Sequence, residues 1–410
     1  MAARNRKYSN SILKYVVQTV AKDEETLKQS IEIGAKTIPG DNNSFLNLTH
    51  YETLFKSSSN VIKMVSVKAK KIQYLVAICL DGVVMGLPIK SAVGRISWKS
   101  QIQSPPTLDI VPHSFAIFSV VYDSINDCFY IVLMMPHGDK GVFWVGLRDL
   151  IISSKGSDGS YLQQLIDHVP SESAKFTPKV FLGLAMDERN FLYSCHGDFP
   201  DVTVWDVDFV DEKPKATLTR IIETTTIPGI SPDFKAAFCA VFTQPCDDNS
   251  GVRQRLLALG NMWDSSVFVL ITKGDQVLAS DMENENDDVD GDSSSVSVPA
   301  TPHFTDQVMV AMCAAEANET PRNRPLVDKP RDISFDRFGH LYIVDHENFN
   351  IKIMKFKPVV ERLWTSQCLW QSPRLHSQPL SCVAMVKESK GKLTPLIYAG
   401  LFNNDVALFH

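Results

Sequence analysis

The sequence lacks the long apolar run that a membrane-spanning helix requires. The chain has 410 residues, and none of its apolar runs approaches the length of ~18 residues that would suggest a membrane span. It also has little excess charge, with a formal net charge of −6 and a pI of about 5.9. No global basic field therefore indicates nucleic acid or an anionic membrane as a partner. We expect neither a membrane span nor a nucleic-acid partner.

The cysteines are scattered and lack the spacing of a metal site. The eight cysteines include no CxxC, and Cys79, Cys128, Cys195 and Cys382 fall inside apolar, strand-like runs. A free cysteine in such a run behaves as a small buried hydrophobe, and a chain without a disulfide framework is typical of a reducing compartment. The pattern favours an intracellular, cytoplasmic protein. The basic start of the chain, which has no acidic residue before Asp23, keeps a mitochondrial location open.

The common catalytic and nucleotide-binding motifs are missing. The sequence has no GxxxxGKS/T phosphate loop, no GxSxG nucleophile elbow and no HExxH metal motif. Residues 286–291 match NxDxDG, but Ser297 stands where a calcium loop needs its bidentate glutamate. We predict no cofactor, no bound metal and no catalytic residue, which is more typical of a binding protein than of an enzyme.

A repeated pattern of short apolar strands is present. Residues 332–356, DISFDRFGHLYIVDHENFNIKIMKF, alternate apolar and polar positions and align without a gap with residues 183–207. This period-2 alternation is typical of β-strands with two distinct faces. Four more segments follow the same template: 61–89, 120–145, 236–271 and 381–409.

The copies recur at a regular interval. Each has an anchor residue in its middle strand, and the anchors recur roughly every 60 residues, with one longer interval before the fifth. Small antiparallel sheets arranged around an axis form a β-propeller. We therefore predict an all-β fold, a six-bladed β-propeller, with these anchors: Tyr74, Tyr130, Tyr193, Leu257, Tyr342 and Tyr398.

The clearest copy, residues 330–356, resembles an NHL repeat. It departs from the family pattern at Asn350, where a basic residue is common. The resemblance implies an NHL-like propeller, since such proteins commonly have six blades and some bind RNA. The residues that carry it are Pro330, Asp336, Gly339, Tyr342, Asp345 and Asn348.

The sequence divides into a helical extension over residues 1–40 and a propeller over 41–410. Apolar residues at i, i+4 spacing predict a helix over 9–34. The acidic, serine-rich segment at about 280–300 has too few apolar groups to order itself, so we predict a disordered insertion.

Two further segments carry predictions of their own. The last copy ends at the last residue, so we expect a strand from 42–55 to pair with 405–410 and complete its sheet. Tyr161, Leu162, Leu165 and Ile166 predict a short helix between blades.

We predict a non-enzymatic scaffold that mediates protein–protein interaction, with a partner of unknown identity. Its candidate partner-facing loop residues are Asp198, His346 and Asn348, and we expect the turn residues Asp345 and Asn348 to bond within their own loop.

Two alternatives stay open. A six-bladed propeller hydrolase or lyase with a metal in the central channel would need several acidic or histidine side chains at one mouth, for which His113 and Asp345 are further candidates. An RNA-binding NHL propeller would need a continuous basic face with exposed aromatic residues. Shared fold alone cannot choose among these functions.

Overall fold

The computed structural model of the chain describes the following residues: 51–69, 72–89, 95–105, 115–134, 141–156, 160–167, 180–197, 200–224, 227, 230, 233–244, 252–261, 266–272, 275–276, 304–309, 327, 329–336, 338–360, 363–372, 380–386 and 396–409. The predicted N-terminal helix and acidic insertion lie outside these residues, as do His113 and Asp198. The described part is almost entirely β, with one short helix, α3 (Leu147–Ser153).

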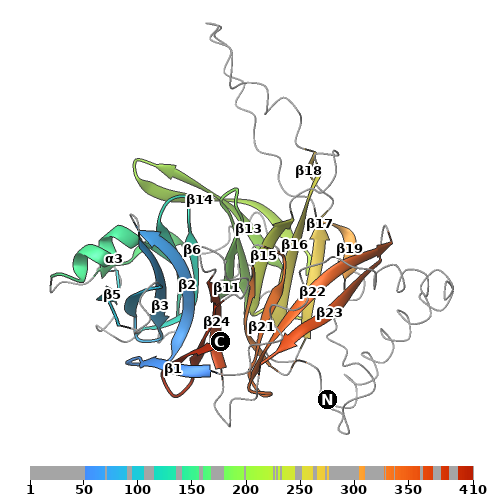
Figure 1. Ribbon diagram of the computed structural model, residues 1–410. Helices are drawn as coiled ribbons and strands as arrows, with labels where there is room; N and C mark the ends of the chain where they lie inside the picture. Colours follow the sequence, from blue (N-terminus) through green and yellow to red (C-terminus); the bar gives the residue numbers. More distant parts are fainter. Residues whose placement is uncertain are drawn as a thin grey trace, which may run out of the picture.

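The strands form six sheets, which are antiparallel apart from one short parallel pairing and are here called blades 1 to 6 (Figure 1). Blade 1 contains β2 (Val61–Ala69), β3 (Ile72–Cys79), β4 (Val83–Pro88) and β5 (Trp98–Gln103). Blade 2 contains β6 (Ala116–Asp123), β7 (Cys128–Met134), β8 (Val142–Gly146) and β10 (Gln163–Ile166). Blade 3 contains β11 (Phe181–Met186), β12 (Phe191–His196), β13 (Val202–Val210) and β14 (Lys213–Ile222).

The second half of the chain repeats this order. Blade 4 contains β15 (Phe238–Gln244), β16 (Val252–Asn261), β17 (Ser266–Thr272) and β19 (Phe304–Met309), and β18 (Asp275–Gln276) also pairs with β16. Blade 5 contains β20 (Pro330–Phe335), β21 (Leu341–Asp345), β22 (Asn350–Val360) and β23 (Leu363–Gln371). Blade 6 contains β24 (Leu380–Val386), β25 (Leu396–Leu401), β26 (Asp405–Phe409) and β1 (Tyr51–Lys56).

The six blades close into a ring. The first strand of each blade contacts the first strand of the next, and β24 of blade 6 contacts β2 of blade 1. These six strands therefore surround the central axis, and the fold is the six-bladed β-propeller that the sequence predicts. The six anchor residues, Tyr74 to Tyr398, each lie in the second strand of a different sheet, as expected.

Both ends of the described chain build blade 6. β1 pairs with β26 in antiparallel register, from Tyr51 opposite Phe409 to Lys56 opposite Asp405. Directly after β1, the Ser57 N–H donates to the Asn404 carbonyl at 2.7 Å. The pairing covers the outer edge of β26, which would otherwise present unpaired backbone groups. It joins the two segments that were expected to meet.

The hydrophobic core is divided among the interfaces between neighbouring blades. Alternate residues of one strand enter different interfaces: Phe129 and Ile131 of β7 pack between blades 1 and 2, whereas Tyr130 and Val132 pack between blades 2 and 3. The same arrangement continues around the ring to the interface between blades 6 and 1. Period-2 alternation in this protein therefore separates two apolar interfaces rather than core from solvent.

The helix predicted from Tyr161 to Ile166 is wrong. Ser160–Tyr161 forms β9, a short strand parallel to β5, and Gln163–Ile166 forms β10, antiparallel to β8. β10 supplies the fourth strand of blade 2. The open edge of β8 needs a hydrogen-bonding partner, and this tertiary pairing outweighs the local helical spacing.

Three turn aspartates fix the tight turn between the first and second strands of their blades. Asp336 Oδ1 accepts the N–H groups of Phe338 and His340 at 2.7 and 2.9 Å. Asp123 and Asp187 accept turn N–H groups in the same way, as aspartates in tight turns commonly do. Each also accepts the hydroxyl of its blade's anchor, Tyr130, Tyr193 or Tyr342.

Candidate binding site at the mouth of the axial cavity

A cavity of about 210 Å³ lies on the axis of the ring. Its lining includes residues from the first strand of all six blades, near the end where each of these strands begins. Most of the wall is apolar, with Phe118 and Phe238 among its larger side chains. The polar and charged side chains of the lining are Asn60, Lys63, Ser119, Arg331, Asp332 and Ser381.

A recurring irregularity aims side chains into this cavity. In five of the six innermost strands the pairing with the second strand shifts register near the strand's beginning. Such a β-bulge leaves a residue unpaired and re-aims its side chain. At each of these shifts one skipped residue lines the cavity: Ile62, Phe118, Gly183, Arg331 and Ser381.

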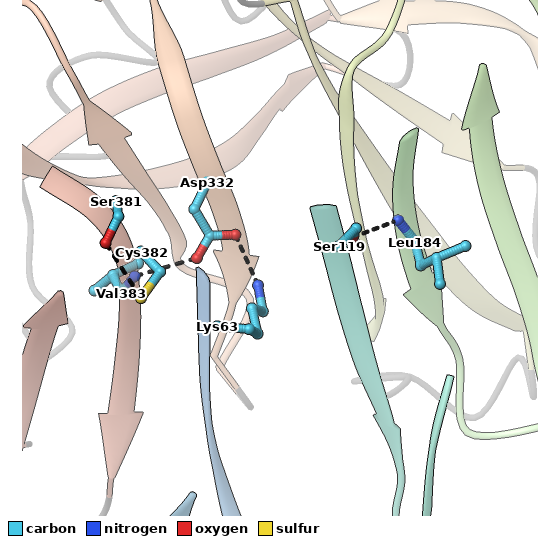
Figure 2. A network of polar contacts seen from close by, with 7 residues as sticks. All are labelled: Lys63, Ser119, Leu184, Asp332, Ser381, Cys382 and Val383. Atoms are coloured by element: carbon cyan, nitrogen blue, oxygen red, sulfur yellow. Dashed lines mark hydrogen bonds and ion pairs between the residues drawn. The ribbon is translucent and has the colours of Figure 1, made fainter. Parts of the chain in front are cut away.

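Polar side chains that follow the bulges tie neighbouring blades together. Figure 2 shows the Val383 N–H of blade 6 donating to Asp332 Oδ2 of blade 5 at 3.1 Å. On the other side of the ring, the Leu184 N–H of blade 3 donates to Ser119 Oγ of blade 2, also at 3.1 Å (Figure 2). These backbone donors lie in the innermost strands, so the side chains satisfy groups that would face the axis unpaired.

Asp332 also forms an ion pair across the ring closure. Its Oδ1 lies 2.7 Å from Lys63 Nζ of blade 1, so this one carboxylate joins blades 5, 6 and 1 (Figure 2). Burial raises the pKa of Asp332, and the Lys63 ammonium opposes that rise. The side chains of Lys63 and Asp332 are 19% and 9% exposed. The Lys63 and Asp332 charges thus interact with each other, and Asp332 also accepts a backbone N–H.

Arg331, the bulge residue beside Asp332, differs from this pair. Its guanidinium carbon lies 5.8 Å from the centre of the Phe402 ring, which is a cation–π distance. Burial lowers the pKa of Arg331, and the guanidinium stays protonated at neutral pH. Among the described residues no carboxylate forms a salt bridge with it; Glu347, whose charge attracts it, is paired with Lys329 at 2.8 Å.

His346 and Phe402 complete the mouth. Phe402 is 37% exposed, and the His346 ring packs edge-on against it with 5.0 Å between centroids. His346 Nδ1 lies 3.2 Å from the Leu380 carbonyl, so it carries the proton and donates. Burial lowers the pKa of His346, so the ring is neutral near pH 7 with Nε2 as an acceptor. We call Arg331, His346 and Phe402 the mouth patch.

The other predicted site residues fall elsewhere. Asn348 turns inward: its Nδ2 donates to Asp345 Oδ2 at 2.9 Å, and its N–H donates to Asp345 Oδ1 at 3.3 Å. Asp345 is fully buried and also pairs with the ammonium of Lys352. Asp345 therefore has the local role that the sequence predicts, whereas the Asn348 side chain acts as the donor. The partner-facing role of Asp198, His346 and Asn348 stays a prediction.

The described residues contain no group of three or more His, Cys, Asp or Glu side chains that could hold a metal ion. In the same part of the chain, no helix has the length and apolar character to cross a membrane.

Comparison with known proteins gives a distant structural match and no family. No protein-family model and no curated protein sequence matches the chain. One similar solved structure is titled "Streptogramin B lyase structure". It shares 6% sequence identity at a TM-score of 0.42, over 88% of this chain and 97% of that one. Such a distant likeness carries no argument about function, and the NHL resemblance stays a resemblance of one blade.

Proposed function

We propose that this protein is a non-enzymatic propeller scaffold that binds a partner protein at the mouth of its axial cavity. The observation that carries the proposal is that the polar groups there have two different roles. Asp332 and Lys63 hold the blades together. The mouth patch combines an aromatic ring with an arginine that forms no salt bridge to a described carboxylate.

Arginine and aromatic side chains are enriched among the residues that dominate protein–protein binding energy. The mouth patch sits on a rigid frame, because Arg331 belongs to an innermost strand and Phe402 to the turn after β25. Binding at a rigid patch costs little conformational entropy. The fold and the patch together are therefore suited to present a fixed surface to another protein.

The same geometry disfavours acid–base chemistry at the axis. A general acid or base must exchange a proton with a substrate, whereas the axial carboxylate of Asp332 already accepts from Lys63 and Val383. The patch is also small and mixed in charge, since Lys329 and Glu347 pair beside it. RNA binding favours a continuous basic face. We therefore place protein binding before the lyase and RNA alternatives.

Photo-crosslinking tests the proposal. A photoreactive phenylalanine analogue replaces Phe402 in the full chain in its native cells, and the crosslinked protein is identified by mass spectrometry. Phe338 offers a matched control, because it is an exposed phenylalanine (61%) in a turn between first and second strands, at the opposite end of the blades from Phe402. We expect a discrete adduct from position 402 and none from position 338.

The purified partner then gives the decisive affinity. Phe402→Ala should weaken its binding at least about tenfold, the usual effect of truncating an aromatic hot spot, whereas Phe338→Ala should change it less than about twofold. Equal effects of the two substitutions, or a partner crosslinked only through position 338, would show that the mouth patch is not the binding surface.

A further inference from the structure

We infer that the axial cavity is a pocket for an apolar side chain, and that Arg331 at its mouth pairs with a carboxylate next to that side chain in the partner. This inference rests on the proposed function and specifies its ligand chemistry: an acidic residue adjacent to an aromatic or branched aliphatic one. The two halves of the ligand correspond to two features of the site, one electrostatic and one steric.

The electrostatic feature is a cation that forms no salt bridge with any carboxylate of the described residues. The charged side chains of the cavity lining are Lys63, Arg331 and Asp332. Lys63 and Asp332 neutralise each other at 2.7 Å, which leaves Arg331 as the net positive charge of the lining. A half-buried cation without an anion is costly. The guanidinium fork matches a carboxylate with two parallel hydrogen bonds, so a ligand carboxylate is the group that relieves this cost.

The steric feature is the shape and polarity of the cavity. A closed apolar cavity of roughly 150 Å³ is known to accept benzene, and this one has about 210 Å³. Leu184, Phe118 and Phe238 provide an apolar wall. A purely ionic ligand would leave the apolar wall exposed to water, and a purely apolar ligand would provide no carboxylate for Arg331. A ligand with both groups satisfies both features.

Benzoate is the simplest probe of this chemistry, and benzamide is its uncharged match. Titration of each into the full-length protein, followed by calorimetry or ligand-observed NMR, compares wild type with Arg331→Gln and Lys329→Gln. Lys329 is the control cation because it is already paired with Glu347 and does not line the cavity. We expect benzoate to bind at least about tenfold more tightly than benzamide, since a charge-assisted hydrogen bond is worth about a factor of ten or more. Arg331→Gln should remove this preference and Lys329→Gln should not.

Equal binding of benzoate and benzamide, or an unchanged benzoate affinity in a folded Arg331→Gln protein, overturns the inference. The partner gives the second arm of the test. If partner binding depends on Phe402 but not on Arg331, the scaffold function stands and the carboxylate pairing is wrong. If benzoate binding depends on Arg331 but position 402 crosslinks no protein, the scaffold function is wrong. The carboxylate that Arg331 binds would then not come from a partner protein.

Discussion

Replacing Lys63 with methionine should destabilise the whole ring, because it leaves the Asp332 carboxylate buried without its counterion. Methionine keeps most of the lysine's apolar stem and removes only the ammonium. Removal of one partner of a buried ion pair costs roughly 3–5 kcal/mol. Asp332 keeps the Val383 N–H, and the Lys63 side chain is 19% exposed. We therefore expect about 3 kcal/mol, the lower end of that range, from urea unfolding at pH 7.

The loss should depend on pH with a definite sign. Burial already raises the pKa of Asp332, and Lys63 is the main group that lowers it. Without Lys63 the pKa rises further above the ordinary value of about 3.9. A carboxyl whose pKa is raised by folding binds more protons in the folded state than in the unfolded state. Its contribution to the free energy of unfolding is therefore fully present below the ordinary pKa and is lost as pH rises through the folded-state pKa. The variant should therefore lose more stability relative to wild type at pH 7.5 than at pH 5.

A second substitution separates charge from packing. Lys63→Met combined with Asp332→Asn removes the stranded charge, and the new amide oxygen can still accept the Val383 N–H. Neutral replacement of both partners of a buried pair is often nearly free, so most of the lost stability should return. Lys329→Met is the control, since its ion pair with Glu347 has a similar length, 2.8 Å, but is exposed; it should cost less than about 1 kcal/mol. The reasoning fails if Lys63→Met costs no more than Lys329→Met, or if the double variant recovers nothing.

Three further predictions concern the frame. Asp336→Ala removes the acceptor of the Phe338, His340 and Tyr342 donors and should cost at least about 3 kcal/mol in urea unfolding; a loss below that of Tyr342→Phe would contradict this. Gly339→Ala should cost about 2–4 kcal/mol, because φ is +79° and the new Cβ would lie 2.7 Å from Phe242, whereas Gly156→Ala, with open space around it, should change stability little. Deleting residues 1–55 removes nearly all of β1 and should give aggregated protein on size exclusion, whereas deleting 1–8 should leave the melting temperature unchanged; a soluble, equally stable 1–55 deletion would refute closure by β1.

The architecture could be predicted because each blade needs two apolar faces. Phe129 and Tyr130 are neighbours in sequence but pack in different interfaces, so each copy contains short apolar runs that the sequence shows directly. The anchor residues recurred at a roughly regular interval, which gave the number of blades. β10 could not be predicted in this way, since only the open edge of β8, a tertiary feature, makes Gln163–Ile166 a strand.

The site was much harder to predict. Whether Arg331 or Asp332 enters the ladder depends on the register of β20 against β21, and the bulge there is set by pairing rather than by residue type. The Lys63–Asp332 pair joins residues 269 positions apart, and no local pattern relates them. His346 could be found because it lies in a turn at the mouth, but its contact with Phe402 follows only from the meeting of blades 5 and 6.

The central claim is that two adjacent charged residues have different roles: Asp332 stabilises the closed ring, and Arg331 binds a ligand. The unfolding free energy of Arg331→Gln, measured in urea at pH 7, tests this most directly. Among the described residues, Arg331 would lose its cation–π contact with Phe402, worth about 0.5–1 kcal/mol at an exposed site, and an attraction to Glu347 beyond salt-bridge distance. We therefore predict a loss of no more than about 1 kcal/mol. A loss as large as that of Lys63→Met would show that Arg331 is also part of the frame and would contradict the claim.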